Sequence, residues 1–237
     1  RGAPDRPCRR VRILDCRFFT GDDAIAGRYW EDTLISGCIV NSSCNGIRLI
    51  GPASRLTIHD CLFYGPGAYP HRTSDRNNML SGILLQPGAW DATRGVLDDV
   101  LISDVTMQRV ASPVSVWLKP GNRAGRITVA RLTATGAYRS ALSFESFGEE
   151  PIESVVLRDV AAEFDGGGTR EQAAAPVPAP GVDVRALPAW GLYARGVNRL
   201  CLESVRLSAT TRDERPAARF EEVLQLAVDD FRYTRSQ

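Results

Sequence analysis

A short pattern recurs along most of this chain of 237 residues. It consists of a branched aliphatic residue, two further residues, and then Cys or an aliphatic residue. It occurs as ILDC (13–16), ISGC (35–38), IHDC (58–61), ISDV (102–105), VARL (129–132), LRDV (157–160) and LESV (202–205). The final residues of these segments lie 22, 23, 44, 27, 28 and 45 positions apart. The spacing indicates a structural repeat of about 22 to 28 residues, with insertions in the two long intervals.

A second apolar segment begins about nine residues after each pattern. These segments alternate apolar and polar residues between Gly, Asn, Asp and Ser, as is typical of short β-strands. They are AIA (24–26), GIRLI (46–50), GILLQ (82–86), PVSVWLK (113–119), ALSFES (141–146) and GLYAR (191–195). The segment ARFEEVLQLAVDDF (218–231) completes a last repeat if it forms strands rather than a helix.

Short strands at this period predict a parallel β-helix, in which each coil stacks about 4.8 Å above its neighbour. Leucine-rich and helical repeats fit less well, because the LxxLxL signature and a 3.6-residue period are both missing. An antiparallel sandwich would need closely spaced hairpin turns, and Asn-Gly or Asp-Gly turns are rare here. We therefore expect an all-β, single-domain solenoid over residues 1–237, with about seven coils and loop insertions at about 64–80 and 165–190.

The cysteines fit the interior of such a solenoid. Cys16, Cys38 and Cys61 would stack in one ladder, which Val105 and Leu132 would continue. Cysteine packs as a small hydrophobic residue, and a disulfide between stacked parallel strands would be strained. We expect free thiols. The spacing of the six cysteines shows no metal-binding pattern, and we expect neither a metal nor another cofactor.

Charge and hydropathy narrow the possible partners. The formal net charge is +1 and no basic block is present, which argues against nucleic acid as a partner. No run of about 18 apolar residues is present, so the sequence predicts no membrane span. The chain begins at Arg1 without Met or a signal-like segment, and we expect a mature form or a fragment.

Two adjacent carboxylates, Asp22 and Asp23, lie between apolar runs in FFTGDDAIAG (18–27). Successive side chains of a strand point to opposite faces, so both can face one groove only if Gly21–Asp23 forms a turn. Neighbouring like charges favour protonation of one carboxyl, so one aspartate of the pair could act as the acid of an acid-dependent active site. The alternative is that both aspartates only cap and solvate a turn.

Strand alternation predicts further side chains on the same face. If Ile47 and Leu49 point inward, Arg48 points outward, and the same reasoning applies on later coils. Insertions on a solenoid often wall a groove, and aromatic side chains beside a groove suit sugar rings. His71, in the first insertion, could reach the groove, but we expect a solvated position. The predicted substrate-binding residues are Arg28, Trp30, Asn45, Arg48, Gln86, Trp117, Lys119 and Glu145.

The order GDDAIAG (21–27), CNGIRLIG (44–51) and GILLQPG (82–88) resembles glycoside hydrolase family 28, the polygalacturonase-like enzymes that degrade pectin in cell walls. The stretch LPAWGLYARGV (187–197) also resembles bacterial members. The resemblance implies a right-handed parallel β-helix and an extracellular or periplasmic location. It also implies inverting hydrolysis, with Asp22 as general acid and Asp23 holding the attacking water.

Three family motifs differ in this chain. The aspartate of an NTD motif should lie near residue 1, but Asp5 precedes Asp22 by only 17 positions and would match only if the chain carried a short deletion. We expect instead that the chain is cut inside or just after that coil, or that the motif is absent. The histidine of a GHG motif falls on Asn45. The arginine and lysine of an RIK motif fall on Leu84 and Gln86, which cannot clamp a uronate through charge-assisted hydrogen bonds. A neutral or deoxy sugar is therefore expected at the cleavage site rather than galacturonate.

These observations predict a glycoside hydrolase that acts on a polysaccharide or oligosaccharide. The main alternative is a non-catalytic carbohydrate-binding β-helix that keeps the fold without the full set of acids. A polysaccharide lyase is less compatible, because lyases typically need a uronate, a cation such as Ca²⁺ and a basic residue, and the sequence shows no obvious acidic calcium cluster.

Overall fold

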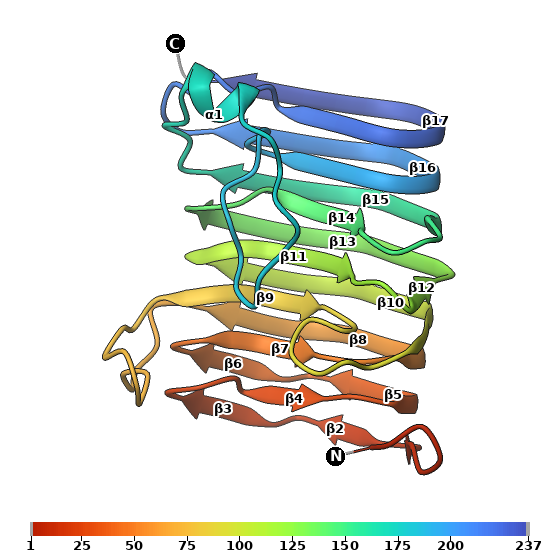
Figure 1. Cartoon of the computed structure of the whole chain (residues 1–237). Coiled ribbons are helices and arrows are strands. Elements are labelled where there is room, and N and C mark those ends of the chain that lie inside the picture. Colours follow the sequence, from red (N-terminus) through yellow and green to blue (C-terminus); the bar gives the residue numbers. More distant parts are fainter. Residues whose placement is uncertain (1, 236–237) are drawn as a thin grey trace.

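The computed structural model of the protein describes residues 2–235, and the 17 strands within that range belong to one hydrogen-bonded sheet (Figure 1). The strands are β1 (Cys8–Arg9), β2 (Arg12–Leu14), β3 (Arg17–Thr20), β4 (Ile25–Gly27), β5 (Trp30–Ser36), β6 (Ile39–Ser42), β7 (Asn45–Leu49), β8 (Ala53–Tyr64), β9 (Met79–Leu85), β10 (Gly95–Gln108), β11 (Val110–Leu118), β12 (Asn122–Ala124), β13 (Arg126–Ala137), β14 (Leu142–Ser146), β15 (Ile152–Phe164), β16 (Leu192–Ala209) and β17 (Ala218–Arg235). The predicted all-β class is confirmed.

Each strand pairs in parallel with at least one strand of a neighbouring repeat. The first segments of the repeats pair in the order β5, β8, β10, β13, β15, β16 and β17. The second segments pair in the order β4, β7, β9, β11, β14 and β16. Figure 1 shows these strands stacked in sequence order from the red end of the chain to the blue end. The last repeat is strand β17 rather than a helix, as predicted.

The predicted ladder of small apolar residues is confirmed by the strand register. Val105 pairs with Cys61 on one side and with Leu132 on the other, and these three residues are buried. The pairings of Ile39 with Arg17 and with Leu62 place Cys38 between Cys16 and Cys61. All six cysteines lie within the described range and carry free thiols, as predicted.

The third residue of the repeated pattern bends the chain at each repeat. Its φ is 53° at Asp15, 52° at Asp60, 55° at Asp104 and 53° at Asp159, and the equivalent Gly37 has a φ of 64°. This left-handed conformation is adopted most readily by Gly, Asn and Asp. The residue at this position, Asp or Gly in five repeats and Arg131 or Ser204 in the other two, therefore turns the strand so that the first and the fourth residues of the pattern both point into the core.

Two long connections leave the stacked strands. Residues 65–78 join β8 to β9, and residues 165–191 join β15 to β16 and contain α1 (Arg170–Ala174). We call residues 175–187 the strap. Figure 1 shows this segment running across the face formed by β14, β11 and β9. Within residues 2–235, no helix has the length and apolar character needed to cross a membrane.

Candidate functional site

The two adjacent aspartates line one cleft. Gly21, Asp22 and Asp23 form a bend between β3 and β4, so the turn predicted from the sequence is present. The cleft has a volume of about 440 Å³. An added Cβ at Gly21 would lie 2.4 Å from the carbonyl oxygen of Pro70, so the bend packs against the β8–β9 loop at a point where only glycine fits.

Asp23 is held tightly. Its side chain is 14% exposed, and its Oδ1 accepts hydrogen bonds from the Asn45 side-chain Nδ2 at 2.8 Å and from the Asn45 backbone N–H at 3.2 Å. Its Oδ2 lies 3.4 Å from Nη1 of Arg48. A carboxylate with an amide donor on one oxygen and a guanidinium on the other is fixed in orientation.

Arg48 joins this carboxylate to the strap and to an aromatic wall. Its Nη2 donates to the carbonyl of Val182 at 2.8 Å, and its guanidinium lies 5.0 Å from the ring centre of Trp90. Its Nε is buried without a hydrogen-bond partner among the described residues. Trp90 is 58% exposed, so its other ring surface is accessible to a ligand.

Asp22 has a different environment. Its side chain is 48% exposed, and its Oδ1 accepts a hydrogen bond from the backbone N–H of Asp23 at 2.8 Å. Nε2 of His71 lies 3.8 Å from Oδ1, and Nε of Arg72 lies 3.5 Å from Oδ2. The adjacent pair thus consists of one accessible carboxyl, Asp22, and one whose orientation is fixed by its neighbours, Asp23.

The β8–β9 loop contributes residues that were not predicted for this site. The His71 side chain is 12% exposed and lines the cleft, contrary to the solvated position expected from the sequence. Cys44 is buried beside it, and Nη2 of Arg76 lies 3.5 Å from the Cys44 sulfur. Burial and the charge of Asp23 raise the pKa of the Cys44 thiol to about 12.

The strap covers most of the face on which a longer groove was expected. Gln86 is fully buried and donates from Nε2 to the carbonyl of Val182 at 3.2 Å. Trp117 is 1% exposed beneath the strap. Glu145 is also fully buried and forms an ion pair with Arg185 of the strap at 2.5 Å. The outward direction that alternation predicted for these side chains is present, but the strap shields them from solvent.

The other predicted binding residues lie outside the cleft. Trp30 is buried in the main hydrophobic core. Arg28 is partly buried and pairs with Asp91, which follows Trp90 in the chain. Lys119 is partly buried just after β11. Of the eight predicted binding residues, only Arg48 is among the cleft-lining residues, and Asn45 contributes indirectly by holding Asp23.

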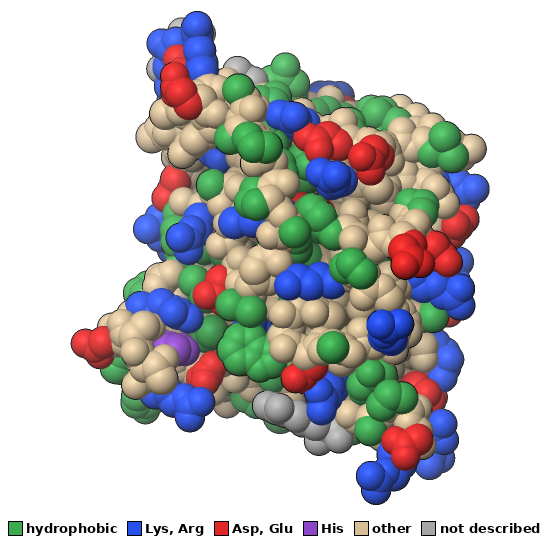
Figure 2. Space-filling view, in the orientation of Figure 1, with side chains coloured by type: hydrophobic (Ala, Val, Ile, Leu, Met, Phe, Trp, Pro, Cys, Tyr) green, Lys and Arg blue, Asp and Glu red, His purple; other side chains and the backbone are tan. Residues whose placement is uncertain are grey.

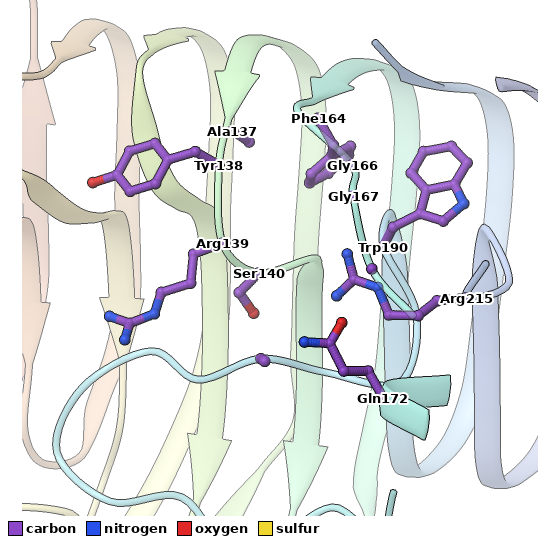
Figure 3. A pocket seen from close by; sticks show the side chains of 12 residues that line it. Ala137, Tyr138, Arg139, Ser140, Phe164, Gly166, Gly167, Gln172, Trp190 and Arg215 are labelled. Atoms are coloured by element: carbon purple, nitrogen blue, oxygen red, sulfur yellow. The ribbon is translucent and has the colours of Figure 1, made fainter. Parts of the chain in front are cut away.

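A second pocket of about 220 Å³ lies between β13, β15 and the start of the β15–β16 connection (Figure 3). Tyr138, Arg139, Gln172 and Arg215 surround it, with Trp190 at its edge. Among the described residues that line it, none is a carboxylate, histidine or cysteine. The larger cleft therefore has the stronger basis for acid–base chemistry.

In Figure 2 the β8–β9 loop projects at the left, where a histidine lies among acidic and basic side chains.

Comparison with protein-family models, with curated proteins and with solved structures gives no match. The fold and the site therefore define the class of the protein on their own: an all-β protein of stacked parallel strands with a cleft built around two adjacent aspartates.

Proposed function

We propose that the chain is a right-handed parallel β-helix whose Asp22–Asp23 cleft hydrolyses a glycosidic bond in a neutral glycan. The parallel pairing of successive repeats supports the β-helix part of this proposal. The third residues of the repeated pattern support it as well, because their left-handed backbone turns the chain at equivalent positions of about seven coils.

The observation that carries the hydrolase proposal is the unequal treatment of two carboxyls in one cleft. Glycoside hydrolysis by inversion uses one carboxyl to protonate the leaving oxygen and a second carboxylate to activate water. Asp22 is the accessible group and takes the role of acid. Asp23, with its orientation fixed by Asn45 and Arg48, takes the role of the base that holds the water.

The composition of the cleft supports a neutral sugar. Three aspartates and three arginines line it, so the formal charges of these side chains balance. The exposed ring of Trp90 offers a stacking surface for a sugar face. The residues that replace the uronate-binding motif, Leu84 and Gln86, are buried and therefore do not select the substrate directly. The charge-balancing side chains are Asp22, Asp23, Asp183, Arg48, Arg72 and Arg76.

The size of the cleft supports action on an oligosaccharide or on the end of a chain. Its volume of about 440 Å³ is within the range of ordinary small-ligand sites, roughly 300–1,000 Å³. The strap covers the face formed by β9, β11 and β14, and its Val182 carbonyl is held by Arg48 and Gln86. A long polymer therefore has no open groove to follow across these strands.

The test is a reducing-sugar assay on a panel of neutral oligosaccharides and polysaccharides. We expect hydrolysis by the wild-type chain, with product of inverted anomeric configuration by NMR. Asp22→Asn and Asp23→Asn should each lower kcat by roughly 10²- to 10⁴-fold. Asp5→Asn is the matched control, because Asp5 is 78% exposed and does not line the cleft. Full activity in both cleft variants would refute the proposal.

Carbohydrate binding without hydrolysis is the second candidate. The observation that favours it is that both oxygens of Asp23 already have partners, Asn45 and Arg48, which compete with a water molecule for this carboxylate. In that case no product would form on any glycan. Binding would survive in Asp22→Asn and would be lost in Trp90→Ala.

A further inference from the structure

Three different types of metal ligand line the cleft. One ligand atom each from Asp22, Cys44 and His71 lies within 4.8 Å of the other two. The three residues come from the bend before β4, from the turn before β7 and from the β8–β9 loop. The strand stacking and the loop therefore bring together a carboxylate, a thiol and an imidazole that are far apart in sequence.

The loop that carries His71 is anchored against the stacked strands. The Asn41 side chain donates to the carbonyls of Tyr64 at 2.9 Å and Pro66 at 2.8 Å, and its Oδ1 accepts from the N–H of Ala68 at 2.7 Å. The hydroxyl of Ser43 donates to the carbonyl of Tyr69. These contacts hold the loop next to Cys44, so the three donors are brought together by the fold.

The histidine ring is also oriented by its surroundings. Its Nδ1 lies 2.9 Å from the hydroxyl of Ser74, which leaves Nε2 facing Asp22. In metal sites the second ring nitrogen of a ligating histidine commonly has such a partner, which fixes the tautomer and the ring orientation.

We propose that Asp22, Cys44 and His71 bind Zn²⁺. Sulfur, nitrogen and oxygen donors together suit this borderline-soft ion, whereas Ca²⁺ and Mg²⁺ take oxygen ligands. Tetrahedral zinc with ordinary bond lengths requires donor separations of about 3.3 to 3.6 Å. The separation of Asp22 Oδ1 from His71 Nε2 is 3.8 Å, and no pair is farther apart than 4.8 Å. Three protein ligands beside a cleft leave the fourth position for water or another small ligand.

Two arginines oppose the binding of a cation here. Arg72 is 80% exposed and can turn away from Asp22 into solvent. Arg76 is more confined, because its Nη2 contacts the Cys44 sulfur at 3.5 Å and its Nη1 donates to Ser74 at 3.1 Å. Removal of the Arg76 charge should therefore tighten zinc binding, and Arg76→Met is expected to lower the dissociation constant severalfold.

The experiment uses Co²⁺ as a spectroscopic probe for zinc and needs no glycan. Titration of the wild-type chain should produce tetrahedral cobalt bands and a thiolate-to-cobalt charge-transfer band, all of which Zn²⁺ displaces. Cys44→Ser should lose the charge-transfer band, and His71→Ala should bind at least tenfold more weakly. Cys61→Val is the matched control. Cys61 is a buried thiol in the core ladder, where its partner on the next strand, Val105, already is a valine. Ca²⁺ should not displace cobalt.

Thermal unfolding of each variant separates loss of the metal site from loss of the fold. If Cys44→Ser does not fold, the cobalt affinity of His71→Ala still tests the site, because His71 lies in a loop. Absence of a charge-transfer band in the folded wild-type chain would overturn the proposal. Retention of the band in folded Cys44→Ser, or unchanged cobalt affinity in His71→Ala, would overturn it as well. The proposal does not depend on hydrolase activity, so each can fail without the other.

Discussion

The strap is attached to the sheet by a buried ion pair, and the removal of one partner should be costly. Glu145 is fully buried, and its two oxygens accept hydrogen bonds from Arg185 at 3.2 and 2.5 Å. The Arg185 guanidinium also lies 5.4 Å from the ring centre of Trp117 and 5.8 Å from that of Phe147. Arg185→Met preserves much of the packing volume but leaves the Glu145 carboxylate without its counter-ion.

Breaking a buried pair in this way typically costs about 3 to 5 kcal/mol of unfolding free energy. At about 1.4 kcal/mol per factor of ten, this corresponds to a roughly 10²- to 10⁴-fold change in the folding equilibrium. The measured loss should lie near the lower value if the strap lifts and lets water reach Glu145. The double variant Glu145→Gln/Arg185→Met removes the uncompensated charge, and we expect it to recover most of the loss.

The assay is urea unfolding followed by tryptophan fluorescence, which senses exposure of the buried Trp30, Trp117 and Trp190. Arg158→Met is the matched control, because Arg158 pairs with Glu203 at the surface, where its side chain is 52% exposed. Surface pairs typically contribute about 0 to 1 kcal/mol. If Arg185→Met costs no more than Arg158→Met, the Glu145 pair is solvated and the strap is not seated as described.

The same pair makes a prediction about pH. Burial raises the pKa of Glu145, and the charge of Arg185 opposes this effect. A raised folded-state pKa means that this group contributes most stability below its unfolded value of about 4.3, and that the contribution is lost as pH rises through the folded value. Glu145→Gln should flatten this part of the stability profile, whereas Arg185→Met should make it steeper.

Three further predictions concern the corners and the cleft. Gly37→Ala should destabilise the fold by at least about 1 to 2 kcal/mol, because φ of Gly37 is 64° and the added Cβ would lie 2.3 Å from Oδ1 of Asp15. Urea unfolding measures the loss, and an unchanged unfolding midpoint would show that the left-handed backbone at residue 37 does not require glycine. Cys44 should react very slowly with iodoacetamide at pH 8 in the folded chain, because a pKa of about 12 leaves a thiolate fraction of roughly 10⁻⁴. Mass spectrometry of labelled peptides measures the rate, and rapid labelling of Cys44 would contradict the prediction. If the chain both hydrolyses glycans and binds zinc, Zn²⁺ should inhibit hydrolysis, because a coordinated Asp22 cannot donate its proton. Hydrolysis rates measured at several zinc concentrations test this. An unchanged rate when the zinc site is saturated would show that hydrolysis and zinc binding do not share Asp22.

Much of the fold could be predicted because its information is local. Each repeat carries inward aliphatic residues at a fixed spacing, and an error of one residue would place them on the outer face. The Asp15 and Asp60 corners also depend on a single residue's tolerance of left-handed backbone. Identification of the Cys16–Cys38–Cys61 ladder required only the period, which can be read directly from the sequence.

The cover over the outer face could not be predicted in the same way. Alternation gives the direction of Trp117 and Glu145, but it does not state what lies above them. The partner of Glu145 is Arg185, 40 residues later in a loop with no periodic pattern. Tethering of a loop across a sheet depends on such long-range pairs, and a single sequence carries no local signal for them. Their burial is therefore known only from the structure.

The cleft likewise contains residues that could be predicted from local sequence and residues that could not. Asp22 and Asp23 could be predicted because the bend that presents them is encoded by Gly21 beside them. His71 could not, because its position depends on how Asn41 and other side chains anchor the β8–β9 loop. The cleft is the part of the outer face that remains open between two loops. The strap contacts Arg48 through the carbonyl of Val182, and the β8–β9 loop packs on Gly21 through Pro70. The aspartate pair thus has a local origin, whereas the size of the cleft and the groups that surround the pair are set by the two insertions.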